Sequence, residues 1–579
     1  MKVFIKTQHI KKYENVFLYF LRGILFIGVL SICFLASDVK AANVGDVINF
    51  NVDENYDVSA RSQVQAILIQ TTLNLSFYIE KNWWDLQVPA KKVEILTSLD
   101  NLSSEFSNKI YPTLTSVYGS EWKPGVDGDT KITILFQSMK ENFGGYFRSS
   151  DGYIKLQIPD SNEREMLYLP IAEINGTKLK IFLAHEFVHL IIFNQKDRLQ
   201  GVQEEVWLNE ARAEYASQIL GYNDSYGGSN LESRVKDFLA RPSDSLTEWR
   251  DAKYDYGTVN AFIYYLIDHY GINILSDSLK SKLIGISSIN EILLKNGYKE
   301  SFSEIFTNWT IAVAINDCSL DFKYCYLNKN LKSLIINSTI NFLPLSGNSS
   351  LSVTNVTKNW SGNWQKIIGG NGDLKLEFSS SAGLDFQIPY ITFDKNNNSS
   401  VNFLKLDANE KGEINIKNFS DKYNSLIIIP SLQTKFSGFN GFEFTYPYTF
   451  AVSIAGAEKE EDQAIVQKLL AQIDSLKKQI AALQPQVNNQ QGQNLCYTLQ
   501  NNLYVGLSYN SEVSCLQQFL KNQGPEIYPE GLITGNFGIL TKSAVINFQK
   551  KYNIAQTGFV GILTRAKINQ LLNNISNVR

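Results

Sequence analysis

Residues 177–194 read Thr-Lys-Leu-Lys-Ile-Phe-Leu-Ala-His-Glu-Phe-Val-His-Leu-Ile-Ile-Phe-Asn. This largely apolar run predicts a buried helix with Thr177 as its N-cap. Because positions i and i+4 share one face of a helix, His185 and His189 can offer two imidazoles to one metal ion. Glu186 is rotated by about 100° from His185 on such a helix. It would border the ion without binding it, which is where a general base must stand.

The scarcity of histidine makes this pattern specific. The chain of 579 residues contains four, namely His9, His185, His189 and His269. Chance would produce His-Glu-x-x-His in such a chain with an expectation on the order of 10⁻³. The alternative is a buried helix whose two histidines only pack or hydrogen-bond. His269 lies 80 positions after His189, so a carboxylate is the nearer candidate for a third ligand.

The nearest carboxylates with helical spacing lie in residues 207–215, Trp-Leu-Asn-Glu-Ala-Arg-Ala-Glu-Tyr. Glu210 follows His189 by 21 positions, which allows a helix, a turn and a second helix packed antiparallel to the first. Glu214 lies one turn after Glu210 on the same face and can accept the outer N–H of a ligating histidine. The alternative is a solvated acidic face.

His-Glu-x-x-His followed by Asn-Glu resembles the gluzincin zinc metallopeptidases, with Trp-Leu-Asn-Glu similar to the aminopeptidase-N branch and Asn-Glu-x-x-x-acid to the thermolysin branch. The resemblance implies an α+β metallopeptidase domain, a Zn²⁺ cofactor and Glu186 as general base. It implies His185, His189 and Glu210 as the metal ligands.

Two features depart from the aminopeptidase-like pattern. The gap between His189 and Glu210 is slightly longer, and Ala211 stands where a glycine is usual. The exopeptidase motif Gly-Ala-Met-Glu-Asn is absent from the sequence, which favours an endopeptidase. In that branch the tyrosine of a Tyr-x-x-Gly segment stabilises the oxyanion, which implies Tyr254 here, with Tyr256 as the second candidate.

Several segments around this motif also have predicted structures or roles. Residues 131–136 and 153–158 are predicted strands, the second as part of a hairpin with Gly144–Phe147. The resemblance implies an edge strand that pairs with extended substrate, and we expect Gly144–Phe147 near it. His269 precedes Gly271 and is predicted as a cation at a helix end, with a role in the reaction as the alternative.

Residues 1–41 predict export. Six basic and two acidic side chains surround the apolar run Gly23–Ala36, and Val39-Lys40-Ala41 ends the segment. This is the pattern of a signal peptide cleaved after Ala41, with an uncleaved membrane anchor as the alternative. An exported chain favours disulfides, and the remaining cysteines predict Cys318–Cys325 and Cys496–Cys515. The formal charge of −3 excludes a global basic field for nucleic acid.

Composition divides the exported part into regions. Apolar–polar alternation at 374–378, 414–416 and 442–444 predicts a β-sandwich. An a/d stripe stepping by 3 and 4 residues predicts a short coiled coil, through which the chain could oligomerise, or a lone spacer helix. The predicted regions are a metallopeptidase domain (43–335), a β-sandwich (340–455), the coiled coil or spacer (457–484), a Gln/Asn-rich linker (485–494) and a C-terminal module (495–575).

The C-terminal module contains a repeated turn. Gly535-x-Phe-Gly538-x-x-Thr541 is partly echoed at residues 558–564, and each threonine is predicted to cap a helix in a three-helix unit. The segment resembles the peptidoglycan-binding domain of wall hydrolases, which implies peptidoglycan as a partner of residues 495–575. The alternative is a module that keeps this fold but binds something else or nothing.

Together these features predict a multidomain, secreted zinc metalloendopeptidase that hydrolyses peptide bonds in proteins and is held at the bacterial cell wall. Two alternatives stay open. One is a peptidoglycan endopeptidase, with the wall as substrate. The other is a wall-associated adhesion or scaffold protein without activity.

Overall fold

The computed structural model describes residues 42–455, except 142, 346 and 440, and residues 498–576, except 508 and 509. The predicted signal peptide (1–41), coiled coil or spacer (457–484) and linker (485–494) lie outside the described residues. The chain divides into two compact units, an N-terminal unit that ends at Asp462 and a C-terminal unit that begins at Gln463.

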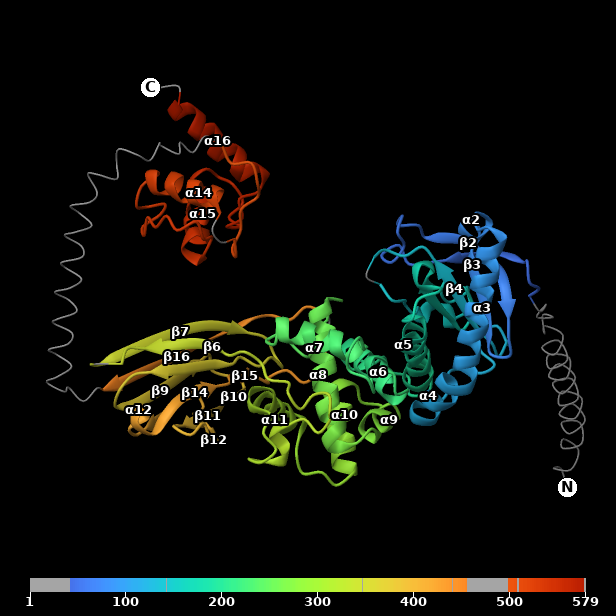
Figure 1. The fold of residues 1–579 in the computed structure, drawn as a ribbon, viewed down its shortest axis with the longest axis horizontal. Helices are drawn as coiled ribbons and strands as arrows, with labels where there is room; N and C mark the ends of the chain where they lie inside the picture. The colour runs from blue at the N-terminus through green and yellow to red at the C-terminus, as the bar shows by residue number, and fades with distance from the viewer. Residues whose placement is uncertain are drawn as a thin grey trace, which may run out of the picture. The chain divides into compact units, whose positions relative to one another are not determined.

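The N-terminal unit begins with a mixed five-stranded sheet in the order β1-β2-β3-β4-β5 (Figure 1). Pairing is antiparallel from β1 to β3 and parallel from β3 to β5, so β5 is an edge strand. The strand predicted at 131–136 is confirmed as β4, whose side chains are all buried. The strands are β1 (Val47–Asn51), β2 (Gln63–Thr71), β3 (Leu75–Glu80), β4 (Ile132–Gln137) and β5 (Met166–Pro170).

Helices cover one face of this sheet and continue beyond it. Ile134 and Phe136 of β4 share a core with Leu183 and Phe187 of α5, because alternate side chains of a strand point to the same face. The helices are α2 (Lys81–Asp85), α3 (Pro89–Glu105), η1 (Phe106–Ile110), α4 (Tyr111–Tyr118), η2 (Ser149–Gly152), η3 (Ile171–Glu173), α5 (Leu179–Ile192), η4 (Phe193–Arg198), α6 (Val206–Ile219), α7 (Asn230–Ala240), α8 (Lys253–Tyr270), α9 (Asn273–Ser278), α10 (Gly285–Lys295), α11 (Phe302–Ile315) and η5 (Phe322–Tyr324).

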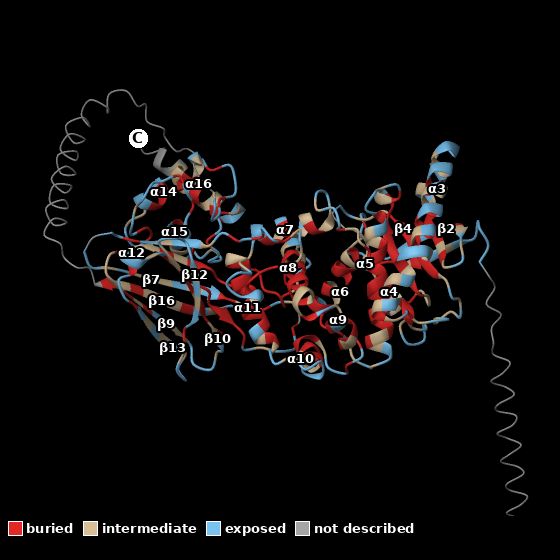
Figure 2. Cartoon of the chain, turned by 60° about the horizontal axis from the view of Figure 1, so that its bottom comes forward, coloured by how far each residue is buried: buried red, intermediate tan, exposed pale blue. Residues whose placement is uncertain are grey.

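Helices α5, α6 and α8 form the centre of the N-terminal unit, and Figure 2 shows them buried over most of their length. Helix α6 packs against both α5 and α8. The predicted cap of α5 is wrong, because Lys178 is the N-cap residue and no side chain caps the helix. Burial of its apolar faces, rather than a cap, therefore stabilises this helix.

The predicted hairpin is also wrong. Residues 153–158 form turns and irregular backbone rather than a strand. Leu156 is 90% exposed, so burial of its side chain does not stabilise a strand at this position. Tyr146 instead pairs with Tyr168 of β5 through two backbone hydrogen bonds of 3.0 Å each. The segment Gly144–Phe147 therefore lies along the edge of the sheet.

The second half of the N-terminal unit is a β region of two main sheets around one core. Their orders are β12-β11-β14-β8-β6 and β13-β9-β16-β7, and Leu426 of the first and Phe450 of the second share the core. The elements are β6 (Thr339–Leu343), β7 (Ser349–Thr357), β8 (Gln365–Gly369), β9 (Asp373–Ser380), β10 (Phe386–Gln387), β11 (Pro389–Asp394), β12 (Ser399–Phe403), β13 (Lys411–Ile416), α12 (Phe419–Lys422), β14 (Tyr423–Ile428), β15 (Ser431–Leu432) and β16 (Tyr446–Ala455).

The strands predicted at 374–378 and 414–416 are confirmed as parts of β9 and β13. The alternation at 442–444 predicts a strand wrongly. Phe442 and Phe444 are 58% and 71% exposed, and residues 442–444 are part of an irregular loop that precedes β16.

The β region and the helices are joined by a shared aromatic cluster. Trp360 is fully buried, and its ring centroid lies 5.1 Å from that of Phe302 and 5.4 Å from that of Phe306, both in α11. Its indole Nε1 donates a hydrogen bond of 2.6 Å to the carbonyl of Lys435. One contiguous core therefore spans the two halves of the N-terminal unit.

The C-terminal unit contains α14 (Ser511–Asn522), α15 (Ile539–Lys551) and α16 (Ile562–Ser576). The predicted role of its threonines is wrong, since Gly538 is the N-cap of α15. Thr541 instead accepts a hydrogen bond of 2.9 Å from the buried Gln517 amide, and Thr564 accepts one of 3.0 Å from Gln549. The repeated turns are thus held from inside by two glutamines.

The disulfide Cys318–Cys325 is confirmed, with a sulfur–sulfur distance of 2.01 Å. Cys515 is also disulfide-bonded. Cys496, its predicted partner, lies outside the described residues.

Replacement of Trp360 by alanine tests the shared core. We expect Trp360→Ala to lower the free energy of unfolding by about 3–5 kcal/mol, because it opens a cavity between α11 and the β region. Leu86→Ala, at a site 82% exposed, is the control and should change it by less than about 0.5 kcal/mol. Thermal unfolding measures both. A Trp360→Ala effect as small as that of the control would contradict the shared core.

Candidate metal centre

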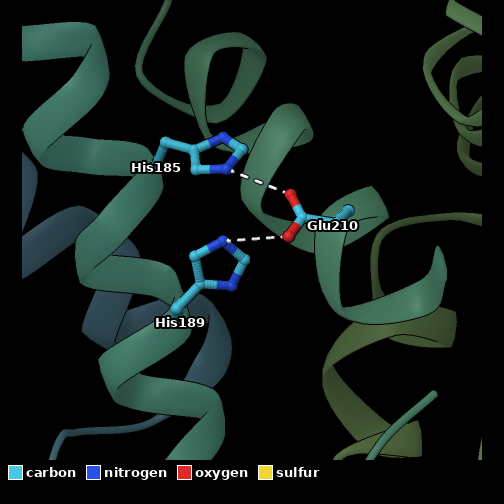
Figure 3. A group of neighbouring side chains, drawn as sticks. All are labelled: His185, His189 and Glu210. Carbon is cyan, nitrogen blue, oxygen red and sulfur yellow. Dashed lines mark ion pairs between the residues drawn. The ribbon is translucent and has the colours of Figure 1, made fainter. Parts of the chain in front are cut away.

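Two helices bring together the three predicted ligands. His185 and His189 lie one turn apart on α5, and Glu210 faces them from α6 (Figure 3). Nε2 of His185 lies 3.2 Å from Oε2 of Glu210, and Nε2 of His189 lies 3.5 Å from Oε1. One ligand atom from each residue lies within 4.8 Å of the others, so a single ion could contact all three.

Outer hydrogen-bond partners orient both imidazoles. Nδ1 of His189 lies 2.9 Å from the amide oxygen Oδ1 of Asn209, which can only accept a proton. Nδ1 of His185 lies 3.5 Å from Oε1 of Glu214. Both contacts favour a proton on Nδ1, so Nε2 is the ring nitrogen of each histidine that faces Glu210 and that a metal ion could bind once it is deprotonated.

Glu214 is held in place by residues that follow it in the chain. Its carboxylate accepts hydrogen bonds of 2.9 and 2.8 Å from Arg234 and one of 2.9 Å from Asn230, both in α7. Burial alone would raise the pKa of Glu214, but the charge and hydrogen bonds of Arg234, helped by His185 and Asn230, together outweigh it and hold the pKa below its usual value. Glu214 therefore remains an anion beside His185.

The charges at the centre fit a cation. Burial would lower the pKa of His185, but its close contact with Glu210 and the charges of the surrounding carboxylates raise it to about 9. Burial would raise the pKa of Glu210, but the two histidines lower it. Oε2 of Glu210 is buried and has no hydrogen-bond donor of good geometry among the described residues. Two imidazole nitrogens and one carboxylate are a donor set that zinc accepts.

Glu186 lies beside these ligands and close to the backbone of the sheet edge. A Cβ atom on Gly145 would lie 3.0 Å from Cγ of Glu186 and 2.8 Å from the carbonyl oxygen of Tyr168, so only glycine allows this approach. Burial, together with the carboxylates of Glu210 and Asp251, raises the pKa of Glu186 to about 8, although the charge of His185 opposes them. Glu186 can therefore exchange protons near neutral pH.

The two candidate tyrosines differ in their surroundings. The Tyr256 hydroxyl donates a hydrogen bond of 2.8 Å to Asp251, and burial together with the nearby charges of Glu210 and Asp251 raises its pKa. The ring of Tyr254 lies under the cations of Arg241 and Lys253, whereas that of Tyr256 lies under Arg234, which also binds Glu214. Residues two apart at the start of α8 face different directions, and the charge of Glu210 acts on Tyr256, so Tyr256 is the candidate carried forward.

Tyr56 also borders the centre, although the sequence pattern does not reveal it. Its ring stacks on Tyr146 at 4.4 Å, next to Gly145. Burial raises its pKa, and the charges of Asp251, Glu186 and Glu210 contribute. Asn209 could have been found from the Trp-Leu-Asn-Glu motif, but Tyr56 and Arg234 stand in no recognisable pattern and are brought here by tertiary structure.

His269 has a different environment. Its Nε2 lies 3.0 Å from the carbonyl oxygen of Cys325, beside the disulfide. His269 lies in the last turn of α8, as predicted, but burial lowers its pKa and so disfavours the predicted positive charge.

The comparison with protein families concerns the C-terminal unit. Residues 509–568 match the family described as "Putative peptidoglycan binding domain". The match begins beside Asn510, the N-cap of α14, and ends within α16. It supports association with the cell wall and peptidoglycan as a partner.

Other comparisons bear less on the chain. No curated protein matches it. One similar solved structure is PliG, a periplasmic inhibitor of g-type lysozyme from Aeromonas hydrophila, with 10% identity and a TM-score of 0.14 over 20% of this chain and 98% of that chain. Another is the Yersinia pseudotuberculosis-derived mitogen, with 10% identity and a TM-score of 0.14 over 20% of this chain and 92% of that chain. A third is the copper-binding CorA of Methylomicrobium album BG8, with 8% identity and a TM-score of 0.14 over 20% of this chain and 100% of that chain. TM-scores this low carry no argument about fold or function.

No helix in the described ranges has both the length and the apolar character that crossing a bilayer requires.

The proton on His185 makes metal affinity depend on pH. In the metal-free chain the pKa of His185 is about 9, so at pH 7 a metal must displace a proton, and raising the pH removes this competitor. We expect zinc affinity to rise between pH 6 and 8 by about tenfold per pH unit for each proton displaced. Calorimetry in buffers of different ionisation enthalpy measures the protons released. His269→Ala should leave the profile unchanged, whereas an affinity independent of pH would contradict the assignment.

Proposed function

We propose that this protein is a zinc-dependent metalloendopeptidase, secreted and held at the bacterial cell wall by its C-terminal unit. The observation that carries the proposal is the convergence of His185, His189 and Glu210 within 4.8 Å, with Glu186 next to them. Hydrolysis of proteins is the proposed activity.

Each group near the centre has a proposed task. Zinc held by the three ligands would polarise the carbonyl of a peptide bond and, by its charge, favour the ionised form of Glu186. Glu186 would take a proton from the attacking water and deliver it to the leaving amine. Tyr256 would donate its hydroxyl hydrogen to the oxyanion that develops on the carbonyl oxygen.

Burial supports general-base chemistry by Glu186. Its side chain is only 5% exposed in total, and a buried carboxylate with a pKa of about 8 holds and releases a proton more readily at neutral pH than an exposed glutamate does. The partial exposure of His185 and Glu210 gives a substrate access to the centre.

A peptidoglycan endopeptidase is the second candidate. The observation that favours it is the family match of residues 509–568, because a wall-binding unit brings a hydrolase to wall peptides as well as to proteins. The centre itself would be used in the same way, so the substrate is the only difference between the two candidates.

The exchange of Glu186 for glutamine tests the activity. We expect Glu186→Gln to retain one zinc ion, because it is not a ligand, and to lose about 10²–10⁴-fold in kcat for casein hydrolysis, because glutamine cannot accept the proton. Metal analysis and a casein assay measure both. Glu300→Gln, an exposed site outside the centre, is the matched control and should behave as the wild type.

Purified cell wall is the second substrate in this experiment. Cleavage of casein that depends on Glu186 supports the protein endopeptidase, whereas cleavage of wall alone supports the second candidate. Absence of zinc, or activity unchanged in Glu186→Gln, would overturn both and leave a wall-associated protein without activity.

A pair of tyrosine exchanges tests the oxyanion donor. We expect Tyr256→Phe to lower kcat by about 10²-fold with little change in KM, because the lost hydrogen bond acts mainly in the transition state. Tyr254→Phe, two positions earlier, should keep kcat within about twofold of the wild type, since no transition-state bond is removed. Steady-state kinetics on a peptide substrate measure the difference. The reverse ranking would assign the role to Tyr254.

A further inference from the structure

One short segment joins the two repeated turns of the C-terminal unit. Leu503 and Val560 exchange backbone hydrogen bonds of 3.2 and 2.9 Å, and the amide of Phe537 donates one of 2.7 Å to the carbonyl of Leu507. Phe537 and Val560 are equivalent positions of the repeat, 23 residues apart. Residues 503–507 therefore lie beside the first turns of both α15 and α16.

This junction exposes apolar side chains that a soluble unit would normally bury. Tyr504 is 50% exposed and Phe559 is 41% exposed, and their rings stack at 6.2 Å. The first turns add two equivalent pairs, of which Ile539 and Ile562 are 76% and 74% exposed. We call this surface the repeat face; its members are Tyr504, Phe559, Ile539, Leu540, Ile562 and Leu563.

Positive charge lies next to the repeat face. Arg565 follows one turn after the start of α16 and donates to the side chain of Asn502. Lys542 lies against Gly558, where a Cβ atom would come within 2.5 Å of its Cγ. Glu512 is the acidic group within reach of Arg565. Over residues 498–576, six basic side chains stand against three acidic ones, in a chain whose formal charge is −3.

We propose that the repeat face is the peptidoglycan-contacting surface of this protein. The stacked rings of Tyr504 and Phe559 form a platform for an N-acetylated amino sugar, and Arg565 pairs with a carboxylate of the peptide stem. Two arguments select this occupant. The family match covers most of the face, and its cationic border complements the free carboxylates of the wall peptides.

The proposal depends on the peptidoglycan-binding unit and not on the zinc centre. Tyr504 precedes the matched residues 509–568, so the family comparison does not assign it a role.

Sedimentation of the full-length protein with purified wall sacculi tests the repeat face. We expect Tyr504→Ala and Phe559→Ala each to lower affinity about tenfold, because truncating an aromatic anchor removes most of its contact. Ile562→Glu, at an exposed site that folding does not require, should lower it at least as much by adding repulsion. Leu532→Glu is the matched control, since Leu532 is 50% exposed in the same unit but outside the face, and it should bind as the wild type.

Soluble muropeptides should displace the wild type, and Arg565→Gln should weaken the salt dependence of binding. Wild-type affinity in Ile562→Glu, Tyr504→Ala and Phe559→Ala would overturn the proposal. The repeat face would then be covered by another part of this chain or by a second copy instead. Equal loss in Leu532→Glu would also overturn it. Failure of the wild type to sediment would contradict wall binding itself, whatever the outcome of the casein assay.

Discussion

The contact of the Glu210 carboxylate with the partly buried imidazole of His185 and the buried imidazole of His189 is the constraint around which the N-terminal unit is arranged. Four carboxylates and two histidines gather there, and gathering ionisable groups away from water is costly unless charges are paired. Arg234 neutralises part of this charge through Glu214. A divalent cation bound between the ligand atoms would compensate the remaining negative charge of the carboxylates.

The β region supports the same centre. The backbone amide of Gly438 donates a hydrogen bond of 2.9 Å to Glu205, the N-cap residue of α6. The amide of Glu443 donates one of 3.2 Å to Glu248, just before the segment that carries Asp251 and Tyr256. Loop 436–444 thus anchors both segments that face α5, which makes the β region part of the framework of the candidate centre rather than a detached spacer.

The C-terminal unit has a small core and stabilises its two repeated turns through buried side chains. It has few apolar residues for burial, and each repeated turn presents backbone groups that need partners. Gln517 and Gln549 provide them from inside, since each amide is buried and bonds the backbone of its turn. This arrangement leaves the apolar side chains of the first helical turns on the surface, where they are available for binding.

The sequence by itself determined the positions of the two candidate ligand histidines and of the neighbouring glutamate, the strand at β4, one disulfide, and the C-terminal unit that matches the putative peptidoglycan-binding domain. These features depend on local spacing, such as i and i+4 on one helix. Only the tertiary structure brought Tyr256, Tyr56 and Arg234 to the surroundings of the centre, left residues 153–158 in turns rather than a strand, and joined the β region to the helices through one core. Such outcomes depend on which surfaces bury one another, and contacts between residues distant in the chain leave no periodic trace in the sequence.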